Sequence, residues 1–427
     1  MVFPSVAMAG RRAGVSGLRF QVSGECWPDG RCMEIQRNAR SDGSPDGVVG
    51  RRAPWVSRIR AEGGNLMTPK QGELAQRRLL LGIANVGFWV VASIGGLAWV
   101  FSGRWTFDGV GAAAIGIVAV GLQAVFDGIG GGLLVPGTRP TLGAFLKGWG
   151  RGVCVHALVL AGIGAVAAVS LRWTGGFCTG LAASMVALAL GRRFLHAAIS
   201  GAADRTVPVE GGGSLLVTQV DDPAFTGGLV GFASRAGILV PEAWCQRLPQ
   251  SDLQVELSRR RWRAEQRLPF RTLIVLMLWN LVGCQIGSIT VDIASLTTGA
   301  ALIGQACWMT LWSFLGLLVL PSLGRATVFA ADRAAAAAGL DPSGWIRSFP
   351  TITGEDGSHR ELVEKVFYPI PSAARRMESL RSPVGGPLLG DLARSQLYYS
   401  MAGLTLLGRA VHCNVGRPAL WVFPPSA

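Results

Sequence analysis

The chain has 427 residues, half of them hydrophobic and only 15% charged, and its mean hydropathy is +0.38. This composition excludes an ordinary soluble protein, and apolar stretches of about 18 residues or more indicate an integral membrane protein. The net charge of +14 lies largely beside the ends of these stretches, where anionic lipid and topology explain it. Because no recognition motif accompanies the charge, we expect a lipid bilayer and no nucleic acid as partner.

Residues 1–66 differ in composition from the rest of the chain. They hold ten arginines, no lysine and six acidic residues, and no apolar region in them is long enough for a secretory signal. Met67, by contrast, begins a segment that runs through Arg77 and Arg78 directly into an apolar stretch. We expect residues 1–66 to be a disordered arginine-rich tail or an over-extended gene start.

Six apolar stretches are predicted to cross the bilayer. They are residues 79–101, 109–126 (or on to 134), 152–171, 174–191, 272–291 and 295–320. They group into a four-span region within residues 67–192 and two further spans within residues 272–320. A seventh stretch, residues 395–408, is short and marginal. Polar side chains within the spans, such as Asn280 and Gln305, are predicted to hydrogen-bond between helices.

The basic residues predict the orientation of the spans. They are concentrated before the first span, between the second and third spans, and in residues 192–271, which hold eleven arginines. The alternate connections are short and nearly neutral. By the positive-inside bias, the amino terminus, the middle segment and the carboxyl tail face the cytoplasm. We expect a protein of the bacterial cytoplasmic membrane with both termini cytoplasmic.

Residues 193–271 are the only sizeable polar stretch between spans, and they are too few to bury a large core of their own. Short strands are predicted at residues 214–220 and 237–241, and a helix is predicted from residue 251 onward. Residues 321–427 are expected to form a helical tail that packs with this segment. The aromatic and basic residues near its end predict a helix on the membrane surface, anchored by Trp421.

The order of these elements resembles that of membrane zinc metallopeptidases of the HtpX and CAAX prenyl protease type. Asp222, Pro223, Ala224 and Phe225, followed by Gly227 and Gly228, are similar to a strand and turn that line the substrate cleft of that family. The segment with Arg325, Asp332 and Arg333 is similar to its second metal-site helix. The resemblance covers residues 214–380. It implies a polytopic α-helical membrane protein with a small cytoplasmic α+β insert resembling a gluzincin-type metalloprotease domain.

At the positions where this family has its metal-site residues, the chain has side chains that cannot bind a metal. The two zinc histidines and the general-base glutamate fall on Arg259, Arg263 and Arg260, the third ligand on Val328 and a loop histidine on Ile370. A guanidinium has no lone pair for a metal, and Val and Ile have none either. We therefore expect no cofactor, and zinc only if the chain has an unrecognised site.

Two features of the resemblance are open to a purely structural interpretation. Asp332 is predicted to pair with Arg325 or Arg333, and the Asp-Pro and Gly-Gly pairs equally well mark an ordinary turn.

The helix that carries Arg259, Arg260 and Arg263 is predicted to face water, lipid phosphate or an acidic partner, because clustered cations are unfavourable when buried without partners. Glu256 and Glu265 are predicted to offset part of this charge from one helical turn away.

These observations favour a catalytically inactive, metallopeptidase-like membrane protein that binds a partner or a polypeptide at the cytoplasmic face. Two other functions stay open at this point. One is an active membrane zinc endopeptidase with an unrecognised site. The other is a channel or carrier built from the spans.

Overall fold

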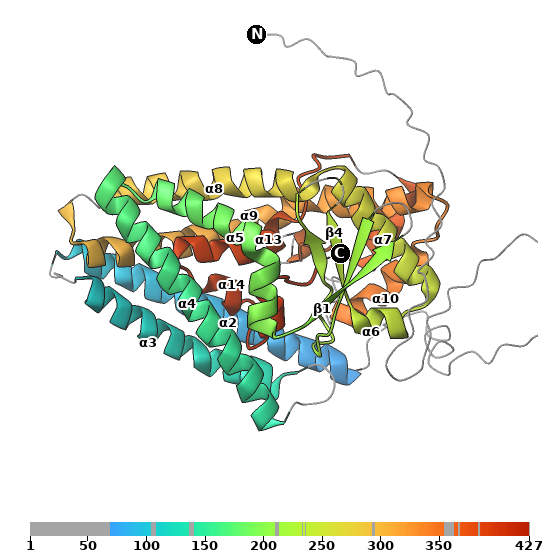
Figure 1. The fold of residues 1–427 in the computed structure, drawn as a ribbon, viewed down its shortest axis with the longest axis horizontal. Coiled ribbons are helices and arrows are strands. Elements are labelled where there is room, and N and C mark those ends of the chain that lie inside the picture. Colours follow the sequence, from blue (N-terminus) through green and yellow to red (C-terminus); the bar gives the residue numbers. More distant parts are fainter. Residues whose placement is uncertain are drawn as a thin grey trace, which may run out of the picture.

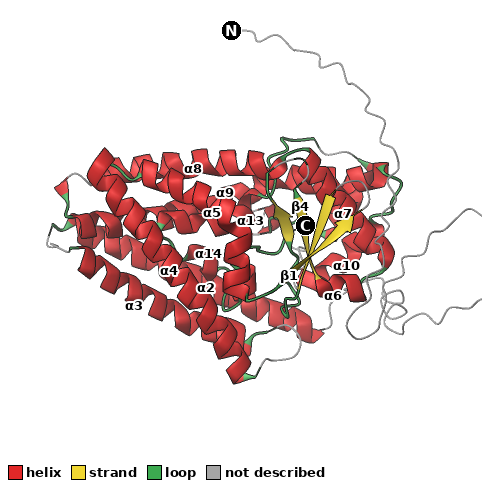
Figure 2. Cartoon of the chain, viewed as in Figure 1, coloured by secondary structure: helices red, strands yellow, loops and turns green. Residues whose placement is uncertain are grey.

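The computed structural model describes most of the chain beyond the amino-terminal tail. Its described residues are 69–103, 108–135, 141–209, 213–232, 234, 236–292, 295–353, 363–365, 368–382 and 385–426. The predictions for residues 1–66 and for a start at Met67 lie outside these residues. Most of the described chain is helical, with one small sheet at one end of the helices (Figures 1 and 2).

Six helices in the described part are long and apolar enough to cross a membrane, and they follow the six predicted spans in order. They are α2 (Pro69–Phe101), α3 (Gly109–Asp127) with its π-helical extension η1 (Gly128–Leu133), α4 (Leu142–Thr174), α5 (Cys178–Ser200), α8 (Leu268–Thr290) and α9 (Thr298–Ala337). Large apolar side chains such as Leu158, Leu190 and Phe194 are 73 to 79% exposed. Such an apolar exterior suits lipid, so the chain is an integral membrane protein.

Local signals set several helix ends. The Thr141 side chain accepts a hydrogen bond from the Ala144 N–H and caps α4, and Thr297 caps α9 in the same way. Gly175 follows α4 with a φ of 69°, a left-handed conformation that favours glycine at a helix end. Between helices, Asn280 hydrogen-bonds Gln396, and Gln305 donates to the Cys284 carbonyl, which confirms the predicted role of these polar residues.

The sheet has four strands in the order β1-β2-β4-β3. Its strands are β1 (Asp204–Val209), β2 (Gly213–Thr218), β3 (Gly228–Val230) and β4 (Gly237–Pro241). The β1–β2 and β3–β4 pairs are antiparallel, and β2 and β4 are parallel. The two predicted strands correspond to β2 and β4. Strand β3 is a sheet edge that pairs with β4 on one side.

What we term the sheet-bearing part consists of the sheet and four helices: α6 (Glu242–Arg247), α7 (Gln250–Glu265), α10 (Ser343–Thr353) and α12 (Ala373–Arg381). Helix α12 packs on α9 and α10. A hydrophobic cluster joins the sheet to α7, to the end of α9 and to α10; it includes Leu215, Val240, Val255, Val328, Trp345 and Phe349. Burial of these side chains is the main driving force that holds α7 against α9.

The carboxyl-terminal segment lies inside the helix bundle. Its short elements are α13 (Leu392–Tyr399), η3 (Ser400–Gly403), α14 (Leu407–Ala410) and η4 (Pro418–Leu420), and they contact α2, α4, α5, α8 and α9 (Figure 1). Trp421 is only 2% exposed, so the prediction of a surface helix anchored by this residue is wrong. No span-length helix forms at residues 395–408 either.

Small residues on the spans allow this close approach. A Cβ atom on Gly131 would lie 2.0 Å from the Gly416 carbonyl oxygen, and one on Gly152 would lie 2.7 Å from the Pro418 side chain. Arg409 of the segment forms an ion pair with Asp127 of α3, and both side chains are buried. The segment is therefore held by close backbone packing and by a buried charge pair, features that a local reading of its sequence does not reveal.

Candidate functional site

The three arginines of α7 that stand at the expected metal-site positions are buried. Arg259 is 0% exposed, Arg260 is 3% and Arg263 is 8%. The prediction that this helix faces water, lipid phosphate or an acidic partner is therefore wrong for Arg259, which has no exposed surface. Buried guanidinium groups need carboxylates or carbonyl oxygens as partners, and the fold supplies them from distant parts of the chain.

Arg259 lies between two buried carboxylates. Its Nη1 hydrogen-bonds Glu256, one turn earlier on α7, and its Nε lies 2.8 Å from Asp332 Oδ1 on α9. Arg376 of α12 donates two hydrogen bonds of 2.8 Å to Asp332. Arg260 donates to Glu256 over 2.7 Å. We call Glu256, Arg259, Arg260, Asp332 and Arg376 the arginine–carboxylate network.

The ion pairs predicted for this region have different outcomes. For Asp332 the prediction is corrected, because Arg259 and Arg376 pair with it and Arg325 instead pairs with Glu364. The predicted pairs of Glu256 with Arg260 and of Glu265 with Arg261 are confirmed. The confirmed pairs are four residues apart on one helix, a spacing that sequence alone reveals.

Charge within the network fixes its protonation states. Burial by itself would raise the pKa of Glu256, but Arg259, Arg260 and Arg263 outweigh it and hold this pKa below its ordinary value of 4.5. For Arg259, burial acts to lower the pKa, but Asp332 and Glu256 outweigh it and raise this pKa above its ordinary value. At neutral pH, Glu256 is therefore a carboxylate and Arg259 a cation.

The remaining expected ligand positions lie in apolar surroundings. Val328 is 1% exposed and Ile370 is 9% exposed, and both belong to the cluster that joins the sheet to α9. Within the described residues, no group of three His, Cys, Asp or Glu side chains converges in a way that suits a metal ion. The donor set between α7 and α9 consists of guanidinium groups already paired with carboxylates, and it does not fit zinc.

The expected cleft residues form a well-defined turn before β3. The Asp222 carboxylate accepts a hydrogen bond of 3.0 Å from the Ala224 N–H and also pairs with Arg417 of the tail. Phe225 is fully buried and stacks on His196. Gly227 has a φ of 73°, and a Cβ atom there would lie 2.0 Å from the Leu239 carbonyl oxygen, so this position requires glycine.

The end of the chain lies beside this turn. The Ser426 N–H donates to Thr226 Oγ1 over 3.0 Å, and a Cβ atom on Gly228 would lie 2.8 Å from the Phe423 ring. Arg192 of α5 donates a 2.9 Å hydrogen bond to the Val422 carbonyl and stacks on the Phe423 ring. A carboxyl-terminal segment of the chain therefore lies against the residues that the resemblance expects to line a cleft.

Sequence reasoning missed three residues that complete this region. Arg376 neutralises Asp332, Arg417 fixes the turn through Asp222, and Asp391 lies 3.6 Å from Arg263. Each stands far from its partner in the sequence. The signal in the sequence was the excess of arginine on α7. Three buried arginines on one helix require carboxylate partners from other parts of the chain.

Comparisons of this chain with family models, with curated proteins and with solved structures find no match.

Proposed function

We propose that this chain is a catalytically inactive relative of the HtpX and CAAX prenyl protease type of membrane metallopeptidase, and that it binds an extended polypeptide at the cytoplasmic face of a bacterial membrane. The observation that carries the proposal is the position of Arg259. Its guanidinium is fully buried between Glu256 and Asp332, where the resemblance requires a neutral histidine that binds zinc.

The arginine–carboxylate network argues against a hydrolytic centre on chemical grounds. A zinc hydrolase needs a metal to lower the pKa of bound water to about 7 and a carboxylate to accept its proton. Here Glu256 already accepts hydrogen bonds from Arg259 and Arg260, and Asp332 accepts two from Arg376. A metal ion bound to either carboxylate would lie next to these buried guanidinium groups, and the repulsion between the cations would oppose its binding.

The proposal that the chain binds a polypeptide rests on the edge strand β3 and on residues 422–426 near it. An exposed strand edge binds extended peptides through main-chain hydrogen bonds. Residues 422–426 of the chain itself lie beside the turn that leads into β3, with the Phe423 ring against Gly228 and the Ser426 N–H bonded to Thr226. A segment of another polypeptide with similar composition, apolar and containing proline, suits the same place.

The test uses fluorescent unfolded casein and the full chain in detergent. We expect casein to bind and to stay intact, with or without added zinc. A synthetic peptide with the sequence of residues 422–427 should compete with casein, and a scrambled peptide should not. Cleavage that requires zinc and stops with a chelator would establish the active peptidase instead. Binding that the peptide does not reduce would contradict the assigned cleft.

A further inference from the structure

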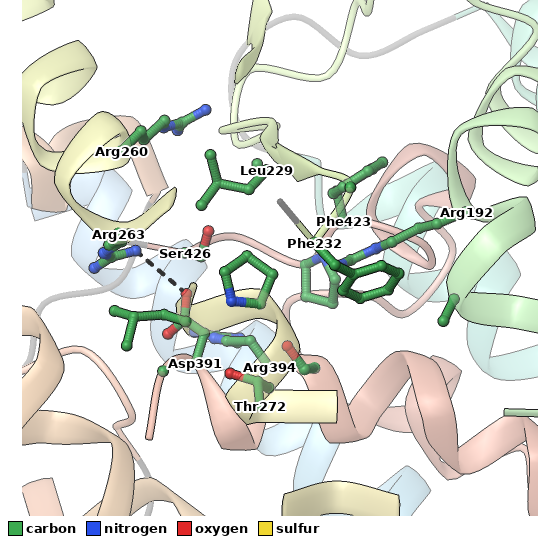
Figure 3. A pocket seen from close by; sticks show the side chains of 18 of the residues that line it. Arg192, Leu229, Phe232, Arg260, Arg263, Thr272, Asp391, Arg394, Phe423 and Ser426 are labelled. Atoms are coloured by element: carbon green, nitrogen blue, oxygen red, sulfur yellow. Dashed lines mark ion pairs between the residues drawn. The ribbon is translucent and has the colours of Figure 1, made fainter. Parts of the chain in front are cut away.

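A cavity of about 90 Å³ opens beside the network, where α5, α7, α8 and α13 meet the edge of β3 and the end of the chain (Figure 3). Leu229 of β3 and Phe423 of the tail form parts of its wall. A space of this size accommodates several water molecules or one compact ligand. It lies apart from the Arg259–Asp332 pair, neither of which lines it.

The lining of this cavity is strongly cationic. It contains four arginines and one carboxylate; these are Arg192, Arg260, Arg263, Arg394 and Asp391. Helix α8 also begins here, at Leu268 and Pro269, and no side chain caps its first turn. The amino-terminal end of a 23-residue helix adds a partial positive charge to that of the guanidinium groups. Arg260 is paired with Glu256, which lies outside the cavity, and Asp391 is the carboxylate in the lining itself.

Arg263 is the clearest sign of a missing ligand. Its Nη1 lies 3.6 Å from Asp391 Oδ2, beyond a normal hydrogen bond (Figure 3). Its Nε and Nη2 are buried and have no hydrogen-bond partner. Burial lowers the pKa of Arg263 to about 10, so the group is still a cation at neutral pH. A buried guanidinium with unused donors is unfavourable, and the long contact with Asp391 leaves Nη1 able to donate to an acceptor in the cavity.

We infer that this cavity binds a phosphate group, and that the nearest source of it is the headgroup of a phospholipid. Guanidinium forks and an uncapped helix amino terminus together match the oxygens of a phosphate. The cavity stands at headgroup depth, because Arg192 lies in the last turns of span α5 and Leu268 is the first residue of span α8. The inference is independent of the proposed function, since it needs neither a protease ancestry nor a polypeptide ligand.

The experiment measures binding to the delipidated full chain in a neutral detergent. Three probes are compared: phosphatidylglycerol, a diacylglycerol that lacks the phosphate, and inorganic phosphate. We expect phosphatidylglycerol to bind and diacylglycerol not to bind. Arg263→Gln should weaken phosphatidylglycerol binding about tenfold or more, as expected for loss of a charge-assisted hydrogen bond. Arg261→Gln, which removes the same charge from a partly exposed position outside the cavity on the same helix, should change it less than about twofold.

The outcomes separate the source of the phosphate from the site itself. Binding of inorganic phosphate that depends on Arg263, with no gain from the lipid, supports the site and identifies free phosphate as its ligand. Equal weakening by Arg263→Gln and Arg261→Gln, or no binding of either phosphate probe, overturns the inference. If Arg263→Gln does not fold, Leu229→Trp serves instead, because it fills the cavity without removing a charge. Unchanged binding by Leu229→Trp also overturns the inference.

Discussion

The helix bundle and the sheet-bearing part both contain buried ion pairs, but these pairs have different structural roles. In the bundle, one carboxylate, Asp127, accepts hydrogen bonds from Arg409, from Trp149 and from the Gly416 N–H. Two of these donors belong to the carboxyl-terminal segment, so the charge pair holds a piece of chain inside the bundle. In the sheet-bearing part, carboxylates and arginines from three helices neutralise one another around Arg259.

The difference shows two uses of a buried ion pair. Removing one partner of such a pair is strongly destabilising because it leaves an uncompensated charge. In the bundle that penalty fixes where the tail lies. In the sheet-bearing part, the same penalty holds α7 in contact with α9. The resemblance to the metallopeptidases predicts a metal site at this contact. Substitutions in each region should therefore have different consequences.

The largest effect is expected for Asp332→Asn. This change leaves Arg259 and Arg376 without their shared carboxylate, and it should reduce the free energy of unfolding by about 3–5 kcal/mol. Thermal unfolding of the purified protein in detergent measures the change. Glu265→Gln is the matched control, since its partner Arg261 is partly exposed, and it should cost about 0–1 kcal/mol. Equal effects of the two substitutions would contradict the network.

A smaller loss is expected for Asp127→Asn, because Asp127 pairs with one buried arginine, Arg409, whereas Asp332 pairs with two. We expect a loss of about 2–3 kcal/mol and release of the carboxyl-terminal segment. Cys413 is 4% exposed in the folded chain, so its alkylation by a maleimide, read by peptide mass spectrometry, reports this release. Cys413 should react faster in the variant than in the parent protein. An unchanged rate would show that packing alone holds the segment.

Glu256→Gln should show the pH dependence of the network. The pKa of Glu256 is lower in the folded protein than its ordinary value of 4.5, so its stabilising effect is complete above that value and is lost as the pH falls through the folded pKa. At neutral pH the variant should be less stable by about 1–3 kcal/mol. Unfolding temperatures of parent and variant should converge as the pH falls below about 4. A constant difference would contradict the charge argument.

The smallest effect is expected at Asp252, on the same helix but outside the network. Burial raises its pKa above the ordinary value of 3.8, so the ionised form opposes folding, and the penalty appears as the pH rises through the folded pKa. Asp252→Asn should raise the unfolding temperature by about 1 °C at pH 7. No rise should remain below about pH 3.9, where the group is protonated in both states. A fall at neutral pH would contradict this sign.

The sequence predicted those parts of the structure that depend on local pattern. Six spans follow from runs of apolar residues, and the Glu256–Arg260 pair follows from a spacing of four on one helix. The pairing of Asp332 with Arg376 joins residues 44 apart, and that of Asp127 with Arg409 joins residues 282 apart. No local pattern encodes such pairs, so the burial of α7 and the place of the tail were both mispredicted.

The central claim is that paired arginines stand where a zinc site would be, and zinc content tests it most directly. The full chain, purified without chelator and incubated with excess zinc, is exchanged into zinc-free buffer and analysed for bound metal. The account predicts well below one zinc per chain, with no change in the unfolding temperature on zinc addition. One tightly held zinc per chain, lost on Asp332→Asn or Glu256→Gln, would contradict it.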